Sequence, residues 1–139
     1  MTDGGSRITG GCLCGRTRYR ATGPALFGLL CYCADCQKAS GTGHVPIMGV
    51  GKSGFSVEGP VVVSENIGGS GRKARRNFCA ECHSLLFGTP EVAPDLVTIY
   101  AGSVDDGDLF VPQKAQFTRA RQAWDSVPAG LPACEEAAP

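Results

Sequence analysis

Phe78-Cys79-Ala80-Glu81-Cys82, in the middle of a chain of 139 residues, contains the C-x-x-C pair that decides the fold. Two sulfurs at this spacing can converge on one metal ion from a single turn of the backbone. A second short pair, Cys12-Leu13-Cys14, lies near the N-terminus. A closed structural zinc site needs four protein ligands, and the two pairs supply them as Cys12, Cys14, Cys79 and Cys82. The metal would close a loop of roughly 65 residues, so its binding free energy would become folding free energy.

A third cluster, Cys31-Tyr32-Cys33-Ala34-Asp35-Cys36, is contiguous and can wrap a metal ion by itself. Three protein ligands leave one position open, as in catalytic zinc sites. We therefore expect two zinc ions per chain, with the second one held by the candidate catalytic residues Cys31, Cys33 and Cys36. The eighth cysteine, Cys134, stands alone and is expected to be a packed free thiol.

Length and composition favour a single domain built mostly of β-strands. A chain of 139 residues is enough for one domain of ordinary size. Its 20 glycines and 9 prolines disfavour long helices. Alternating and β-branched runs are typical of short strands, and such runs occupy residues 16–21, 45–50, 57–64, 72–78 and 96–101.

Composition also divides the chain into three segments. The first ten residues are polar and Gly-rich, which predicts a flexible arm over residues 1–10. The cysteine clusters and the candidate strands between them predict a zinc-binding domain over residues 11–127. The remainder is rich in Pro, Ala and Glu, which predicts an extended tail over residues 128–139.

Charge and hydropathy exclude several classes of protein. The 13 basic and 13 acidic residues balance, which argues against nucleic acid as a partner. The longest apolar stretch, Ala25–Cys31, is too short to span a membrane. No signal peptide is visible at the N-terminus, so we expect a cytoplasmic protein whose thiols stay reduced. The sequence indicates no oligomeric state.

The order and spacing of the three cysteine clusters resemble those of the glutathione-dependent formaldehyde-activating (GFA / CENP-V) family. The likeness covers about residues 8–136, because further matching segments follow the clusters at residues 102–106, 110–113, 117, 123–124 and 130–132. The resemblance implies a Mss4-like, or β-tent, fold of twisted antiparallel sheets around zinc, with little helix. It also implies the same division of the cysteines into a structural zinc site of four and a second zinc site of three.

The resemblance further implies an activity and a substrate. The associated reaction joins glutathione and formaldehyde to give S-hydroxymethylglutathione, which in reverse is a carbon–sulfur lyase reaction. A small-molecule thiol, glutathione or a relative of it, is then the expected partner. Zinc with three thiolates is a weak Lewis acid, so we expect it to hold the substrate sulfur near the aldehyde rather than to activate water.

Four positions depart from the family pattern. The family often has His where this chain has Tyr32, and a second His in the neighbourhood that reads Lys114-Ala115-Gln116-Phe117 here. Gln37 stands where Arg is common, and His83 where a left-handed turn favours Gly. Because two candidate proton carriers are missing, we expect weak activity on formaldehyde.

Several other residues have more than one reading. His44 could be a fourth ligand or an acid–base group, or simply a hydrogen-bonded loop residue. Tyr32 and Trp124 could line a pocket or pack in the core. The cations near the clusters could bind substrate carboxylates, form a solvated strand face or balance thiolate charge; they are Lys38, Arg72, Lys73, Arg75 and Arg76.

Two further functions remain open at this level. One is a non-enzymatic, zinc-structured module that binds a protein or a nucleic acid, for which the basic run Arg72–Arg76 is the only support from the sequence. The other is a thiol redox protein that uses the triplet without metal. Zinc stoichiometry separates them, because two ions per chain favour the enzyme and one favours the alternatives.

Overall fold

The computed structural model describes residues 7–69 and 71–138. Its smaller sheet is antiparallel and has the strand order β1-β2-β5, with bounds β1 Arg7–Gly11, β2 Arg18–Thr22 and β5 Phe55–Glu58. The larger sheet has the strand order β10-β3-β4-β9-β8-β7-β6. Its strands are β3 Phe27–Cys31, β4 Val45–Gly51, β6 Val61–Ile67, β7 Lys73–Cys79, β8 Leu85–Gly88, β9 Leu96–Tyr100 and β10 Lys114–Gln116.

Helix is scarce, as the glycine and proline content predicts. The α-helix α1 spans Ala34–Ser40, and the other helices described are short 3₁₀ turns at Lys52–Gly54, Ala101–Ser103, Gly107–Leu109 and Thr118–Ala120. No described helix has the length and hydropathy that a membrane span requires. The prediction of a mostly β fold with little helix is confirmed.

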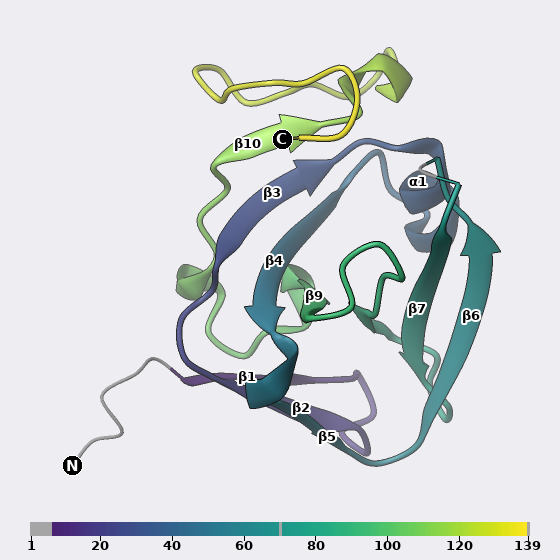
Figure 1. Ribbon diagram of the computed structural model, residues 1–139, viewed down its shortest axis with the longest axis vertical. Coiled ribbons are helices and arrows are strands. Elements are labelled where there is room, and N and C mark those ends of the chain that lie inside the picture. The colour runs from purple at the N-terminus through teal and green to yellow at the C-terminus, as the bar shows by residue number, and fades with distance from the viewer. Residues whose placement is uncertain (1–6, 70, 139) are drawn as a thin grey trace.

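The larger sheet curls so that β3 and β4 on one side face β6 and β7 on the other (Figure 1). The smaller sheet closes the curl at one end, and α1 lies at the other end. Pairing is antiparallel except that β10 runs parallel to β3, so the larger sheet is mixed rather than purely antiparallel. The segment between β8 and β9 lies inside the curl (Figure 1).

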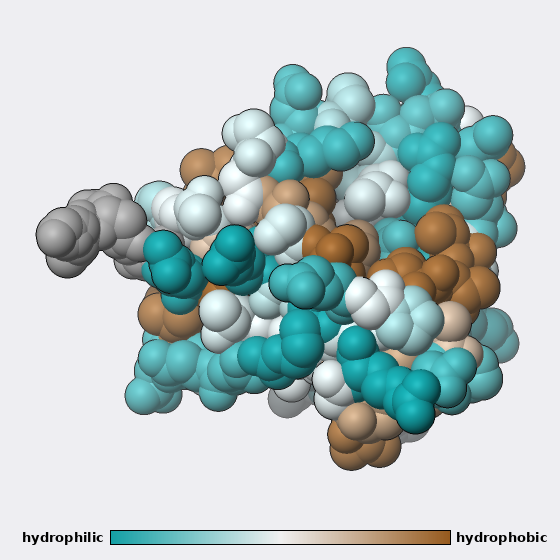
Figure 2. All heavy atoms as spheres, turned by 90° about the horizontal axis from the view of Figure 1, so that it is seen from below, coloured by the Kyte–Doolittle hydropathy of each residue, from teal (hydrophilic) through white to brown (hydrophobic). Residues whose placement is uncertain are grey.

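Strand alternation gives the smaller sheet one buried face. Along β2, Tyr19 and Ala21 are buried, whereas the alternate residues Arg18 and Arg20 are exposed. The buried side packs with Ile8 and with residues of β4 and β9 to form the main apolar core. Figure 2 shows this end of the molecule from below. The surface is largely hydrophilic there, and its apolar side chains lie in separate groups.

The two ends of the chain differ from the expected segments. Residues 7–10, assigned to a flexible arm, form most of β1, because Ile8 alternates into the core; this part of the prediction is wrong. Residues 1–6 lie outside the described residues. The predicted tail runs alongside β10 and is hydrogen-bonded to it. The Ala115 N–H donates to the Pro132 carbonyl at 2.8 Å, and the Cys134 N–H donates to the Ala115 carbonyl at 2.9 Å. The boundary at residue 127 stays a prediction.

The inner face of the larger sheet carries a second apolar cluster, and this cluster contains two of the cysteines. Cys31 ends β3 and Cys36 lies in α1, and both are packed with Leu29, Val45 and Tyr100. The opposite face of the same sheet belongs to the main core. The fold therefore places the triplet on the inside of the curl.

Candidate metal centres and the adjoining cavity

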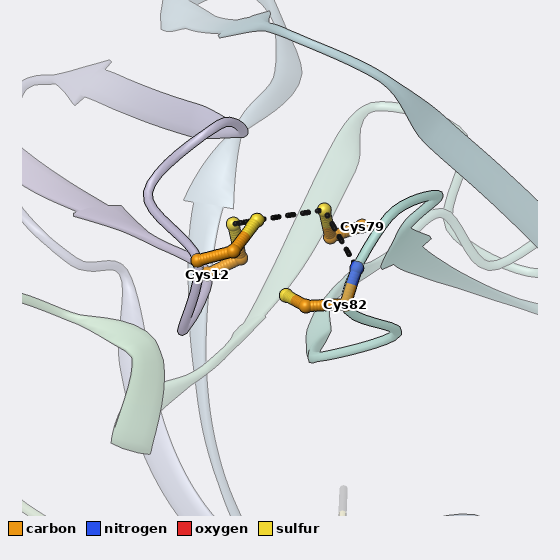
Figure 3. A group of neighbouring side chains, drawn as sticks. Cys12, Cys79 and Cys82 are labelled. Carbon is orange, nitrogen blue, oxygen red and sulfur yellow. Dashed lines mark hydrogen bonds between the residues drawn. The ribbon is translucent and has the colours of Figure 1, made fainter.

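Four thiols converge from two loops that are far apart in sequence. Cys12 and Cys14 come from the loop between β1 and β2, Cys79 ends β7, and Cys82 follows in the next turn (Figure 3). The four Sγ atoms lie within 4.8 Å of one another, with 3.6 Å from Cys12 to Cys14 and 3.8 Å from Cys14 to Cys79. Four sulfurs bound tetrahedrally at about 2.3 Å from zinc lie about 3.8 Å apart. The cluster therefore fits a closed zinc site.

Hydrogen bonds around this cluster favour thiolate ligands. The Thr17 N–H points at the Cys12 Sγ at 3.3 Å, and the Cys82 N–H at the Cys79 Sγ at 3.5 Å. The Ser84 hydroxyl lies 3.1 Å from the Cys82 Sγ, and this contact lowers the pKa of Cys82 to about 5. Such donors around the sulfurs orient metal ligands. The geometry supports the four residues as a structural site.

His83 follows the second pair and has a φ of 62°. Its N–H donates to the Cys79 carbonyl at 2.9 Å, which closes the turn that carries Cys82. The expectation that His83 serves this turn in place of Gly is confirmed, since the left-handed conformation is the one that Gly usually supplies.

The second cluster is built on the start of α1. Cys33 is the N-cap of the helix, and its Sγ accepts from the Cys36 N–H at 3.2 Å. The Sγ atoms of Cys31 and Cys36 are 3.6 Å apart, and the three sulfurs lie within 4.8 Å of one another. Hydrogen bonds from Cys31 and Cys36 hold the pKa of Cys33 far below its usual range. Three sulfurs at this spacing fit three corners of a tetrahedral zinc site.

The triplet opens onto a cavity of about 580 Å³ inside the curl. Apolar walls come from Ile47 on β4, from Pro90 and Val92 between β8 and β9, and from Phe117 after β10. The closed cluster of four cysteines lines none of the cavities described. The two cysteine clusters thus differ in whether a small molecule can reach them from a cavity, as well as in the number of ligands.

Arg76, which also lines this cavity, carries a charge that no carboxylate balances. Arg76 is 8% exposed, and none of the described carboxylates forms an ion pair with its guanidinium. One Nη donates to the Asn66 Oδ1 at 2.7 Å, the other lies 4.0 Å from the Cys36 Sγ, and the buried Nε has no partner. A divalent ion with three thiolates leaves one negative charge, which Arg76 would neutralise. A buried cation beside the sulfurs therefore fits a metal at the triplet.

We expect Arg76→Met to lower the affinity of the triplet for zinc about 10–100-fold, since outer groups of a metal site typically have effects of this size. Met keeps an apolar stem but removes the charge. Competition for zinc with a colorimetric chelator measures the change. Arg75→Met is the matched control, because Arg75 is on the same strand and pairs with Glu65 at 2.7 Å. Equal zinc affinities in wild type and Arg76→Met would contradict this role.

Two of the other cations, Arg75 and Lys73, are paired with one carboxylate. Arg75 lines the cavity but is paired with Glu65, and Lys73 lies 3.8 Å from the same carboxylate. These two residues thus form part of a charged strand face. Arg76 is the member of the run that is buried beside the triplet.

His44 is not a member of either cysteine cluster. Its Nδ1 lies 2.6 Å from Asp125 Oδ2, and its ring stacks on Tyr32 with centroids 4.5 Å apart. The hydrogen bond from His44 lowers the pKa of the Asp125 carboxyl. The loop-residue reading of His44 therefore holds, and the reading as a fourth ligand is wrong.

Two residues that depart from the family pattern, Tyr32 and Gln37, donate hydrogen bonds to the segment that follows β10. Tyr32 is fully buried, and its hydroxyl donates to the Ser126 carbonyl at 2.7 Å. Gln37 donates from Nε2 to the Ala120 carbonyl at 2.9 Å. Tyr32 is thus part of the packing rather than a pocket wall. Trp124 is 73% exposed, so its reading as a core residue is wrong, and it lines none of the cavities described.

Gln116 is a site residue that stands out in the sequence only because the family often has His in its neighbourhood. It pairs with Cys31 in the β10–β3 register, and its Nε2 lies 3.5 Å from the Cys31 Sγ. Its Oε1 accepts from the Ala138 N–H at 3.0 Å. The neighbourhood in which the family often has His therefore does reach the triplet, but through an amide, which donates hydrogen bonds and does not gain or lose a proton near neutral pH.

A family model described as glutathione-dependent formaldehyde-activating enzyme matches residues 7–120. A Halomonas elongata protein named "Putative glutathione-dependent formaldehyde-activating enzyme" is 30% identical over 103 residues, which are 70% of this chain and 66% of that protein. The match thus spans just under two thirds of that relative. A crystal structure of a Rhodobacter sphaeroides protein has a TM-score of 0.52 at 16% identity, over 70% of this chain and 87% of that one. This last likeness concerns the fold alone.

Proposed function

The chain belongs to the glutathione-dependent formaldehyde-activating enzyme family, and from this premise we propose that it forms or cleaves the carbon–sulfur bond between a glutathione-type thiol and a carbonyl carbon. The mostly β structure agrees with the Mss4-like, or β-tent, fold that the resemblance implies. The proposal makes the protein a zinc-dependent carbon–sulfur lyase with two zinc ions per chain. We place it in the cytoplasm, where the clustered thiols would stay reduced.

One observation carries the proposal. Cys31, Cys33 and Cys36 stand at ligand spacing on the wall of the cavity, whereas the other four clustered cysteines form a closed set. A zinc ion held by the triplet would keep its ligands as thiolates and offer a position to one more sulfur. A purely structural role would not require a second cluster that opens onto a cavity of this size.

The chain's own residues would position the reactants. The Cys36 N–H and the Gln116 side chain donate to the sulfurs of Cys33 and Cys31, which fixes the orientation of both thiolates. Arg76 offsets the negative charge of the triplet, with one Nη 4.0 Å from the Cys36 Sγ. Proximity of the thiol and the carbonyl then supplies most of the rate enhancement.

We expect acceleration of glutathione–formaldehyde adduct formation to be weak, because neither family His is present to carry a proton. General acid–base help is typically worth about 10²–10⁴-fold. Exchange spectroscopy at equilibrium, with and without micromolar zinc-loaded protein, measures the rate of hemithioacetal formation directly. A protein-dependent acceleration supports the proposed function. Identical exchange rates with glutathione and every aldehyde tried would refute it.

A further inference from the structure

A second hollow adjoins the triplet cavity along the inner face of the larger sheet. Its volume is about 340 Å³. The two share five lining residues, which are Ile47, Pro90, Val92, Thr98 and Gln116. A ligand with its sulfur at the triplet could therefore extend past these residues into the second hollow.

The floor of this hollow is continuous with Cys31. Alternate residues of a strand share a face, so Phe27 and Leu29 lie on the same face of β3 as Cys31. Leu29 pairs with Ile47 on β4, and Ile47 pairs with Tyr100 on β9. The path that leads from the triplet into the hollow therefore runs over apolar side chains.

The segment between β8 and β9 forms the opposite wall. Pro90, Val92 and Ala93 line the hollow there, and Leu96 lines it at the start of β9. The Val92 side chain is 59% exposed although it lines both hollows. Apolar surface that is concave and open to water favours an apolar ligand.

Charge is distributed unevenly between the two hollows. Arg75 and Arg76 on β7 line the triplet cavity and do not line the second hollow. Lys114 is the only charged residue among the described residues that line the second hollow. Asp35 also lines the triplet cavity and not the second hollow, so the charged groups of a glutathione-type thiol suit the triplet cavity, and a hydrocarbon group suits the side of β4 and β9.

We propose that the second hollow binds the hydrocarbon chain of the carbonyl substrate, so the preferred substrate is the adduct of a glutathione-type thiol with an alkyl or aryl aldehyde. The proposal rests on the proposed function. In the direction of synthesis, a bond forms between the thiol sulfur and the carbonyl carbon, the carbon–oxygen double bond becomes a single bond, and the thiol proton ends on the oxygen. Formaldehyde, with one carbon, leaves this hollow unfilled.

Binding of two stable thioethers to the zinc-loaded full chain tests the proposal without turnover. Each buried CH₂ group contributes about 0.8 kcal/mol, which is about fourfold in affinity. S-pentylglutathione has four more such groups than S-methylglutathione, so we expect it to bind about 10²-fold more tightly in titration calorimetry. Ala93→Asp should abolish most of this gain and leave the affinity for S-methylglutathione unchanged, because Ala93 lines the second hollow and does not line the triplet cavity.

Val63→Asp is the matched control, because Val63 is 51% exposed on β6 and lines neither hollow. It should keep the wild-type preference for the longer chain. Equal affinities for both thioethers in wild type would overturn the inference and leave the proposed function standing. Binding of neither thioether and no binding of glutathione itself in the same titration would overturn both, since the glutathione-type thiol would then be excluded.

Discussion

Cys79→Ser should leave the protein without a cooperative thermal unfolding transition and with at most one zinc ion per chain. Cys79 is fully buried in the main core, and its Sγ lies 3.8 Å from that of Cys14 across the two loops. A structural zinc ion contributes about 10–16 kcal/mol in zinc-finger peptides, whereas a whole domain has a net stability of about 5–15 kcal/mol. The loss of this site therefore exceeds the stability that the rest of the fold can supply.

Calorimetry and metal analysis on the purified variant check this result. Cys134→Ser is the matched control, because Cys134 is half-buried and belongs to neither cluster. The control should melt as wild type does and retain two zinc ions per chain. A strong chelator added to wild type should reproduce the effect of Cys79→Ser, which separates metal loss from the cost of a buried hydroxyl. A Cys79→Ser protein that melts like wild type would rule out the structural role.

The grouping of the cysteines could be predicted because ligand spacing is a local property of the sequence. A C-x-x-C pair places two sulfurs on one turn whatever the rest of the fold does. The distant pair Cys12 and Cys14 could then be assigned because a closed site needs four ligands and the contiguous triplet can wrap a metal ion by itself. The positive φ of His83 follows from the same local reasoning.

The surroundings of the triplet could not be predicted in this way, because they depend on pairings between distant strands. Arg76 reads as one of several exposed cations, and only the curl of the sheet buries it beside Cys36. Gln116 reaches Cys31 through the parallel pairing of β10 with β3. Parallel pairing of a three-residue strand leaves no periodic signal in the sequence.

The aromatic residues show a second limit. Tyr32 is buried because the segment that follows β10 folds back over it, with its hydroxyl bonded to the Ser126 carbonyl. Trp124 belongs to the same segment and points outward. Hydrophobicity alone ranks the two residues in the opposite order, since Trp is the larger side chain. Which of them is covered is decided by the path of the backbone.

Cys33→Ser should remove the second zinc ion and all protein-dependent acceleration of adduct exchange while changing the melting temperature by only a few degrees. The triplet closes a loop of six residues at most, so its metal constrains little chain entropy. Ser is also a favourable N-cap, and its Oγ can accept from the Cys36 N–H as the Cys33 Sγ does. The start of α1 should therefore survive the substitution.

Metal analysis, calorimetry and exchange spectroscopy on the same preparation separate the possible outcomes. One zinc ion, a near-native melting temperature and exchange at the uncatalysed rate are expected together, because the four-cysteine site is untouched. Unfolding of Cys33→Ser would mean that the triplet holds the fold and that the two roles are reversed. Full acceleration with one zinc ion would place the reaction outside the triplet. In Cys33→Ser the guanidinium of Arg76 has no thiolate-bound metal to balance, so we expect Arg76→Met to stabilise the protein in that background, since it removes a buried charge and an unpaired Nε–H.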